Sequence, residues 1–441
     1  MKERKSYGII ILISVLLVAV ISYIVLNIVF SPYWDSIYPP MGYLSFTSFG
    51  QAESDDSVYT KAQAEEDIDY LVKKIGRVHP LCADGIPDIV SETAENVKAE
   101  FGDEVDSYQL WRGCAKVIHM LNDSQSMVLP SFKLSYLKEH RELIDGGYSL
   151  TAVNGTDLQK LFDENKEILS YETEAWGVKA LLNLLDTREG LKLLGLYDNG
   201  VEYTYVDASG HKTVRKYTPD DFYFYNSEGT NDTDAVQTLD IPYRSAIYNE
   251  KAAGLTFDSL AYDDDLKRFL YDFFVDIGDR GISNLIIDLR DCQSGSSQVL
   301  DEILMYTDFK SYKTPGGVWR LGPYMMKWKS EETKIIKMDV DIMFGGNIYV
   351  LTSSNTFGSA TLAAEILQDN GMGSVVGEEC GNLPSGYGEV AAFETPNSAL
   401  LFQISSKQFY RIDEKKNGQP IIPDYRVDPD QALEKALELI N

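Results

Sequence analysis

The sequence predicts an α/β fold in which a largely parallel sheet is covered by helices. Segment 347–388 begins with a buried-strand pattern at 348–351 and continues through a polar turn into a helix that opens at Ser359. Run 284–290 has an apolar centre, which is typical of a strand buried on both faces. A helical pattern with one apolar face, residues 263–279, precedes that run. Strands that alternate with helices along a chain favour a parallel sheet.

The composition is that of a large globular chain. With 441 residues, 44% hydrophobic and 24% charged, it is long enough for two or three domains and a large core. A formal net charge of −28 repels nucleic acid and anionic lipid headgroups, so we expect neither as a partner of the folded part. The four cysteines are sparse and lack metal-ligand spacing, so we expect no metal and no cofactor.

Residues 8–30 are an uncharged, almost wholly apolar run of 23, which is long enough to cross a bilayer as one helix. Lys2, Arg4 and Lys5 precede the run, and acidic residues follow it. The positive-inside rule then predicts a single-pass cell-membrane protein with a cytoplasmic N-terminus and an extracytoplasmic body. A cleaved signal peptide is the alternative. The run is longer than a typical signal h-region and no small-x-small site follows it, which favours an uncleaved anchor.

We expect five consecutive parts. They are a cytoplasmic tip with the transmembrane anchor (1–30), a linker (31–56), an N-terminal helical segment (57–130), a small α+β insert (131–234) and the core (235–441).

Local patterns support this division. The linker is rich in Tyr, Pro, Gly and Ser. Residues 108–122 carry apolar side chains at helical spacing. In the insert, 147–155 alternates like a strand and ends in an Asn-Gly turn, and 201–206 and 212–217 also have strand patterns. Within the core, we expect 315–322 to be a loop because it contains Gly and Pro.

The four histidines give little sign of catalysis. His79 precedes a proline at the end of a helix and is expected to be structural. His119 falls on the polar side of its helix, His140 in a charged helical piece and His211 in a turn, so we expect these three to be solvated.

Active sites of parallel sheets lie at the carboxyl ends of the strands. Two segments begin there, 288–297 and 353–359. A hydroxyl at the start of the helix, as at Ser359, lies beside backbone N–H groups without partners in the helix, a place that can hold an oxyanion. Ser is also a common N-cap that satisfies those amides. The residues alone leave both interpretations open.

Six motifs, in this order, resemble those of the tail-specific or C-terminal processing serine proteases, most closely the branch with the tricorn core protease and retinoid-binding-protein-like domains. They are Leu285-Ile-Ile-Asp-Leu-Arg290 followed by Gly295, Tyr349-Val-Leu, Thr356-Phe-Gly-Ser359-Ala360, Val375-Val-Gly-Glu378, Pro396-Asn-Ser398 and Pro423-Asp424. The resemblance covers the core from about Ile241 onward and, more weakly, the helical segment ending at Asp123.

The resemblance implies a fold and a set of roles. The core would be a crotonase-like β/α superhelix. Ser359 would be the nucleophile that attacks a peptide or protein substrate. The amides of Ala360 and Gly295 would stabilise the oxyanion. The insert around 147–155 is similar to a degenerate PDZ-type module, which some members use to hold the C-terminus of a substrate.

The sequence departs from the family at the general base. The tricorn-like branch has a Ser-His pair in the loop that closes the helical segment, and here Ser124 and Gln125 occupy those positions. A glutamine amide does not accept a proton at neutral pH. The other branch uses a Lys about 25 residues after the Ser, and segment 381–388 contains none. The glycine-rich oxyanion loop is also altered, to Cys-Gln-Ser-Gly at 292–295.

Three hypotheses therefore stay open. The first is a serine peptidase whose base comes from elsewhere, with Lys407, Glu378 and His119 as candidates. The second is a pseudo-protease that keeps the groove and binds peptide segments without cleaving them. The third is an extracytoplasmic structural or interaction module with a filled groove.

Overall fold

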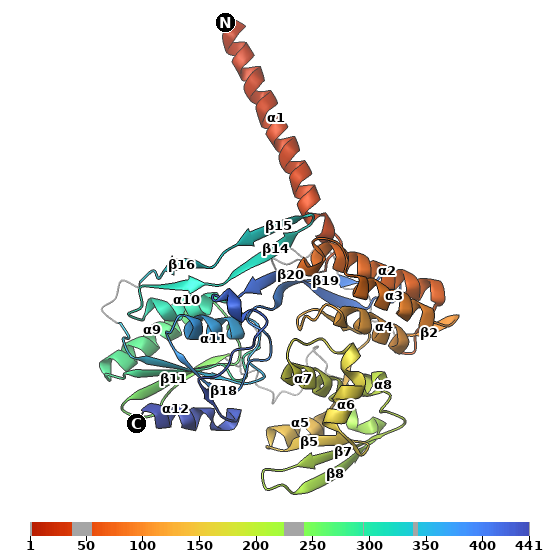
Figure 1. The fold of residues 1–441 in the computed structure, drawn as a ribbon, viewed down its shortest axis with the longest axis vertical. Helices are drawn as coiled ribbons and strands as arrows, with labels where there is room; N and C mark the ends of the chain where they lie inside the picture. The colour runs from red at the N-terminus through yellow and green to blue at the C-terminus, as the bar shows by residue number, and fades with distance from the viewer. Residues whose placement is uncertain (1, 38–54, 225–241, 294, 338–342, 441) are drawn as a thin grey trace, which may run out of the picture.

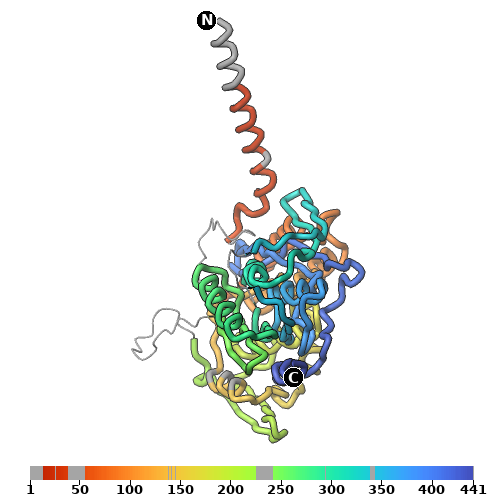
Figure 2. The backbone as a smooth tube through the Cα atoms, turned by 90° about the vertical axis from the view of Figure 1, so that its left-hand side faces the viewer, coloured from red at the N-terminus to blue at the C-terminus, as the bar shows by residue number. Residues whose placement is uncertain are grey.

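The computed structural model describes residues 2–37, 55–224, 242–293, 295–337 and 343–440. A long helix leads into a body of two large sheets, helices and a smaller α+β unit (Figure 1). Figure 2 shows the same helix leaving one end of the body.

The central sheet has six strands and is largely parallel, as predicted. Its order is β10-β11-β12-β17-β18-β21, and only β10 runs antiparallel to its neighbour. The strands are β10 (Tyr243–Ile247), β11 (Ala252–Phe257), β12 (Asn284–Asp288), β17 (Asn347–Thr352), β18 (Ser374–Gly377) and β21 (Tyr425–Arg426).

Helices cover both faces of this sheet because its strands are apolar on both sides. Leu285 and Ile287 of β12 pack into the core formed with α9 (Asp264–Asp279), α10 (Gln298–Met305) and α11 (Ser359–Asp369). Ile286 faces the other way, toward α12 (Ala432–Ile440). The sheet is thus the middle layer of the core.

A second, antiparallel sheet lies beside the first and has the order β15-β14-β20-β19. Its strands are β14 (Gly316–Leu321), β15 (Tyr324–Trp328), β19 (Tyr387–Glu394) and β20 (Leu401–Tyr410), and β3 (Met127–Leu129) pairs with β20. A separate ribbon joins β13 (Ser311–Thr314) to β16 (Glu331–Lys334).

The prediction of a loop at 315–322 is wrong, because most of this segment forms strand β14. Gly317 is needed within that strand rather than in a turn. A Cβ built there would lie 2.4 Å from the indole of Trp328 and 2.6 Å from the carbonyl oxygen of Gln408. The glycine therefore permits a close approach of the neighbouring strands. A site of close backbone approach is one of the places where glycine occurs inside a strand.

The N-terminal helical part consists of β1 (Val58–Thr60), α2 (Lys61–Val78), α3 (Asp88–Glu100), β2 (Glu104–Asp106) and α4 (Ser107–His119). Helix α4 begins at a capping box formed by Asp106 and Gln109 and buries Leu110, Trp111 and Val117. The chain then passes through a short loop into β3 and so reaches the second sheet.

The α+β unit contains a four-stranded sheet of order β6-β5-β7-β8 with helices beside it. The Asn-Gly turn between β5 and β6 has positive φ at Asn154 (48°) and Gly155 (75°), as a two-residue hairpin requires. The elements are β4 (Ser135–Leu137), α5 (Lys138–Asp145), β5 (Ser149–Val153), β6 (Thr156–Asp157), α6 (Leu158–Asn165), α7 (Glu174–Leu185), α8 (Arg188–Leu193), β7 (Val201–Val206), β8 (Lys212–Tyr217) and β9 (Phe222–Phe224).

His140 is not solvated as expected. Its ring is buried, and Nδ1 lies 2.8 Å from the hydroxyl of Tyr205. The aromatic side chains of β7 provide both the packing and the polar partner that the charged local sequence does not reveal.

Helix α1 (Lys2–Phe30) contains the apolar run, and a stretch with mean hydropathy 2.7 is not buried by the rest of the protein. This helix has the length and composition of either a membrane span or a signal sequence. Residues 31–37, placed in a linker by the sequence, pack on the body instead: Tyr33 is buried, and its hydroxyl donates to the carbonyl oxygen of Arg320 at 3.0 Å.

Candidate active site

The carboxyl ends of β12 and β17 bring two loops together. The hydroxyl of Ser353 donates to the carbonyl oxygen of Arg290 at 2.5 Å. The hydroxyl of Thr356 donates to the carbonyl oxygen of Leu289 at 2.8 Å. At the end of the same loop, the Ser359 hydroxyl donates to the carbonyl oxygen of Gly295 at 2.8 Å. The segment after β12 and the start of α11 therefore face one another, as the parallel-sheet rule predicts.

Ser359 is the first residue of α11, and it is not the N-cap. The cap is Gly358, with a φ of 61° that favours glycine, and no side chain caps this end of the helix. The amide of Gly358 instead donates to the side-chain oxygen of Asn382 at 2.8 Å. The simple capping interpretation of Ser359 is thus wrong, because its hydroxyl points across to Gly295.

Gly295 and Ala360, the two candidate oxyanion donors, flank Ser359 but differ in their surroundings. Gly295 has a φ of 124°, and a Cβ there would lie 2.3 Å from the carbonyl oxygen of Leu260. Only glycine fits this position. The Ala360 amide donates to the carbonyl oxygen of Phe357 at 3.2 Å, a long bond that an incoming oxyanion would have to replace.

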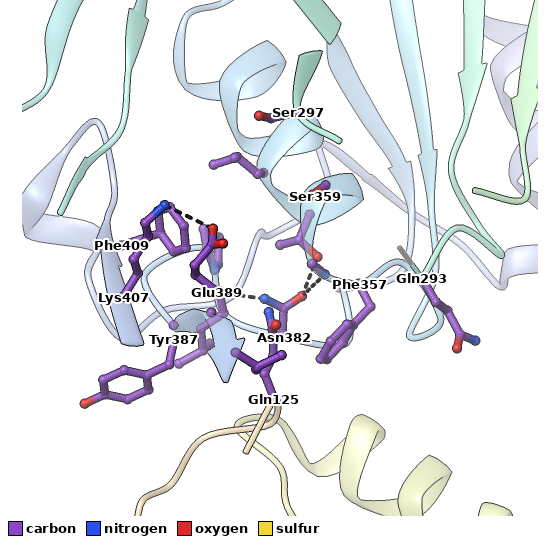
Figure 3. Close-up of a pocket in the computed structure, with 18 of the residues that line it drawn as sticks. Gln125, Gln293, Ser297, Phe357, Ser359, Asn382, Tyr387, Glu389, Lys407 and Phe409 are labelled. Atoms are coloured by element: carbon purple, nitrogen blue, oxygen red, sulfur yellow. Dashed lines mark hydrogen bonds and ion pairs between the residues drawn. The ribbon is translucent and has the colours of Figure 1, made fainter. Parts of the chain in front are cut away.

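A pocket of about 680 Å³ opens beside Ser359 (Figure 3). Its size is within the range of small-molecule and peptide sites. Its lining includes Gln125, Gln293, Gly295, Ser297, Phe357, Gly358, Ser359, Asn382, Leu383, Tyr387, Gly388, Glu389, Lys407 and Phe409.

The helical segment delivers Gln125 to this pocket. Asp123 accepts the amide of Gln125 at 2.8 Å, and the Gln125 carbonyl accepts a bond from the Gln403 side chain of β20 at 2.6 Å. In Figure 3 the Gln125 side chain points from its loop toward the start of α11. Ser124, in contrast, is completely buried and is not among the residues that line the pocket.

Of the three replacement bases considered from sequence, the fold brings Lys407 to the pocket. Its ammonium group lies 3.0 Å from the carboxylate of Glu389 and 4.4 Å from the ring centroid of Trp319. Glu378 and His119 are not lining residues. The Nδ1 of His119 bonds to the carbonyl oxygen of Leu169 at 2.8 Å, so this ring is engaged elsewhere and less solvated than expected.

His79 is structural, as expected. Its ring is fully buried, and Nδ1 accepts the amide of Leu81 at 3.2 Å. Nε2 therefore carries the proton and donates to Asp123 at 3.3 Å. Burial raises the pKa of Asp123, but the hydrogen bonds that it accepts from His79 and from the hydroxyl of Ser126 outweigh burial and leave the pKa below its ordinary value. The pair thus holds the Gln125 loop in place.

Glu389 reaches the pocket through an unusual backbone conformation. It has a φ of 55°, which is uncommon for a residue with a Cβ and costs of order 1–3 kcal/mol. In a regular strand, neighbours along β19 point to opposite faces, yet Glu389 lies on the same side as Lys407, which is paired with Gly388. The left-handed turn of the backbone therefore aims the carboxylate at Lys407.

A partly buried carboxyl behind the pocket wall is not apparent from the sequence. Glu172, from the loop before α7, accepts the amides of Leu383 at 2.9 Å and Tyr387 at 3.2 Å. Burial, and then the charge of Asp123, raise the pKa of Glu172 to about 8. Gly386 makes this approach possible, because a Cβ there would lie 2.4 Å from the carboxyl.

Two neighbours of Glu172 reinforce the contact. The Thr173 hydroxyl donates to the carbonyl oxygen of Gly381 at 2.5 Å, and the Trp176 ring stacks on Phe357 with centroids 4.0 Å apart. The α+β unit thus supports the pocket from outside through residues 172–176. The only sequence signal was an aromatic residue near a helix start, which does not indicate its partner.

Within the described ranges, no group of three His, Cys, Asp or Glu side chains has the arrangement of a metal site. The polar side chains at the pocket carry several hydroxyls, amides, one carboxylate and one ammonium group. This set can bind a peptide backbone and can supply an oxygen nucleophile next to the first amides of a helix.

Comparison with known proteins supports the fold and the type of protein. Residues 255–427 match the family model described as peptidase family S41. The solved structure of mature CPAF is similar over 86% of this chain and 95% of its own, with 12% identity and a TM-score of 0.59. Mature CPAF complexed with lactacystin gives 12% identity, 86% and 96% coverage and a TM-score of 0.61.

The photosystem II D1 C-terminal processing protease aligns over 86% of this chain and 97% of its own, at 10% identity and a TM-score of 0.47. None of the curated proteins compared with the sequence matches it. The match at 255–427 contains β12, β17, Ser359 and Lys407, so the residues that form the pocket lie mainly within it. Segment 255–427 is therefore similar to peptidase family S41, and the whole chain is similar in fold to mature CPAF.

Proposed function

We propose that this protein is a membrane-anchored, extracytoplasmic serine peptidase that cleaves peptide bonds through Ser359, with Lys407 as its general base. The observation that carries the proposal is the placement of Ser359 at the start of α11 in a pocket that also contains Lys407. Gly295 follows β12, and Ser359 and Ala360 begin α11; the Ser359 hydroxyl joins the two segments through its bond to Gly295.

The chemical step follows from these positions. The Ser359 oxygen attacks the carbonyl carbon of the substrate, and Lys407 takes the hydroxyl proton and passes it to the leaving amine. The resulting ester is hydrolysed by water. The amides of Ala360 and Gly295 stabilise the oxyanion, and the loss of one such donor typically costs about 3 kcal/mol of barrier.

The structure corresponds to a resting state in this proposal. A protonated lysine cannot accept a proton, and Lys407 is paired with Glu389. The Ser359 hydroxyl donates to Gly295. A bound substrate that inserts beside Glu389 would separate this ion pair and free the Lys407 nitrogen for proton transfer. Catalysis would then depend on occupancy of the pocket.

A pseudo-protease that binds peptide segments without cleavage is the second candidate. Gln125, which has no basic group, lines the pocket, and the sequence resemblance assigns its position to the histidine of the tricorn-like branch. The same pocket would then serve binding alone.

Cleavage of a peptide library, followed by mass spectrometry, separates the two candidates. We expect cleavage by the unaltered chain, none by Ser359→Ala, and turnover slower by roughly 100- to 10,000-fold in Lys407→Gln. Lys415→Gln is the matched control, because Lys415 is exposed and lies outside the pocket lining. Saturable peptide binding without any Ser359-dependent cleavage would establish the pseudo-protease instead.

The finer architecture belongs to the same proposal. The central sheet with its helices supports a crotonase-like β/α superhelical core over 235–441, and the sheet β6-β5-β7-β8 supports a degenerate PDZ-type insert over 131–234. Residues 57–130 would be the helical segment. Helix α1 supports a single-pass anchor within 1–30, with a cytoplasmic N-terminus and an extracytoplasmic body.

A further inference from the structure

The body is fixed to the end of α1 by direct contacts. The ammonium group of Lys74, a buried residue of α2, donates to the carbonyl oxygen of Pro32 at 3.1 Å and also pairs with Asp35. Arg77 donates to the Ser31 hydroxyl at 2.8 Å. These bonds, together with buried Tyr33, hold the segment after the helix against α2 and β14.

The turn between β14 and β15 touches the last turn of α1. Gly322 has a φ of 61°, and a Cβ built there would lie 2.8 Å from the carbonyl oxygen of Ile28 and 3.1 Å from that of Val29. Ile28 is two residues before the end of the apolar run, which is about 3 Å along a helix axis. Figures 1 and 2 show the hairpin at the end of the body from which α1 rises.

Strand β15 exposes a composition typical of a membrane interface. Tyr324 and Met326 point to the same face and are 56% and 48% exposed, and Trp34, just beyond α1, is 56% exposed. Tyr and Trp are enriched where a membrane meets water. Exposed Lys327 belongs to the run 324–329, which carries two lysines and no acidic residue, in contrast to the net charge of −28 over the whole chain.

We propose that the β14–β15 hairpin and Trp34 form a second membrane contact, which holds the body against the bilayer surface. This inference rests on the proposed membrane span of α1. The contact lies in the headgroup layer and not in the hydrocarbon. Strand β15 is an edge of its sheet, so its outer N–H and C=O groups need water or headgroups as partners.

The contact would also orient the pocket. Trp319 of β14 is paired with Met326 of β15 on one side and with Lys407 of β20 on the other. The strand at the membrane surface and the pocket wall are therefore two strands apart in one sheet. Because one sheet joins the membrane contact to the pocket wall, the pocket would face polypeptide segments close to the membrane.

Site-directed fluorescence quenching of the full chain in phosphatidylcholine nanodiscs tests the proposal. The four native cysteines are buried, so a thiol introduced at an exposed site is labelled selectively. We would label Met326→Cys, with Val18→Cys in α1 and Val214→Cys in β8 as controls; both control positions are exposed. Strand β8 lies at the end of the body away from α1 (Figure 1). Quenchers are nitroxide lipids labelled near the headgroup or near the end of the acyl chain.

We expect the label at position 326 to lose fluorescence with the headgroup-proximal quencher and the label at position 18 to lose it with the deep quencher. The label at 214 should lose none. Equal, weak quenching at 326 and 214 with strong quenching at 18 would overturn the second contact and keep the anchor. Weak quenching at 18 would overturn the anchor itself and the proposal with it. Protection of position 326 from lipid quenchers and from aqueous iodide would indicate a protein partner and also refute it.

Discussion

Glu172→Gln tests the link between the α+β unit and the pocket. The substitution keeps the size of the side chain and removes the titrating proton. In the native protein the carboxyl accepts the amides of Leu383 and Tyr387, and its pKa is raised from 4.5 to about 8. Glutamine retains one acceptor oxygen, so one partly buried amide loses its partner at a cost of about 1 kcal/mol.

The pH dependence carries the sharper expectation. Between about pH 4.5 and pH 8 the folded carboxyl keeps its proton while the unfolded chain has lost it. The contribution of the Glu172 carboxyl to stability is fully present below its pKa in the unfolded chain. This contribution is lost as the pH rises through the interval. At 1.36 kcal/mol per unit, the raised pKa corresponds to a loss on the order of 4 kcal/mol.

Urea unfolding of both chains across this interval measures the effect. The free energy of unfolding of Glu172→Gln minus that of the unaltered chain should rise with pH by several kcal/mol, because the other titrating groups cancel in the difference. Glu174→Gln is the control, since Glu174 is exposed on the same segment. A difference for Glu172→Gln that does not change with pH would refute the protonated, partly buried carboxyl.

Three further substitutions test the local geometry. Glu389→Gly should unfold at higher urea than Glu389→Ala, with about 1 kcal/mol between them, because both lose the ion pair but only alanine retains the left-handed strain; an alanine variant as stable as the glycine variant would contradict the strain. Gly295→Ala should abolish Ser359-dependent cleavage, since the new methyl group meets the Leu260 carbonyl; unchanged cleavage would contradict the placement of this loop. Lys74→Met should speed hydrogen exchange at residues 36 and 37, because the buried ammonium group no longer holds the segment after α1; unchanged protection would show that other contacts suffice.

The sequence predicted the central sheet because its strands are continuous apolar runs. Strands β12 and β17 fall where run 284–290 and the start of 347–388 indicated, and their parallel pairing places Ser359 opposite Gly295. A local pattern and one topological rule were sufficient for that part of the site.

The missed features depend on contacts between distant segments. Strand β14 was taken for a loop because Gly316 and Gly317 are usual turn residues, whereas the structure uses Gly317 to admit Trp328. Glu172 lies more than 200 residues before the amides that it accepts, and no local pattern marks it. The conformation of Glu389 is likewise hidden, since nothing in the sequence distinguishes a glutamate with positive φ.

Reaction of the purified chain with a fluorophosphonate probe, followed by mass spectrometry of the modified peptide, tests the central claim most directly. A nucleophilic Ser359 predicts one adduct on that serine, none in Ser359→Ala, and slower labelling in Lys407→Gln by roughly 100-fold or more. Gln125→His should leave the adduct site unchanged. Absence of any adduct on Ser359 in the unaltered chain, together with its appearance in Gln125→His, would contradict the account and identify a pseudo-protease that lacks only its base.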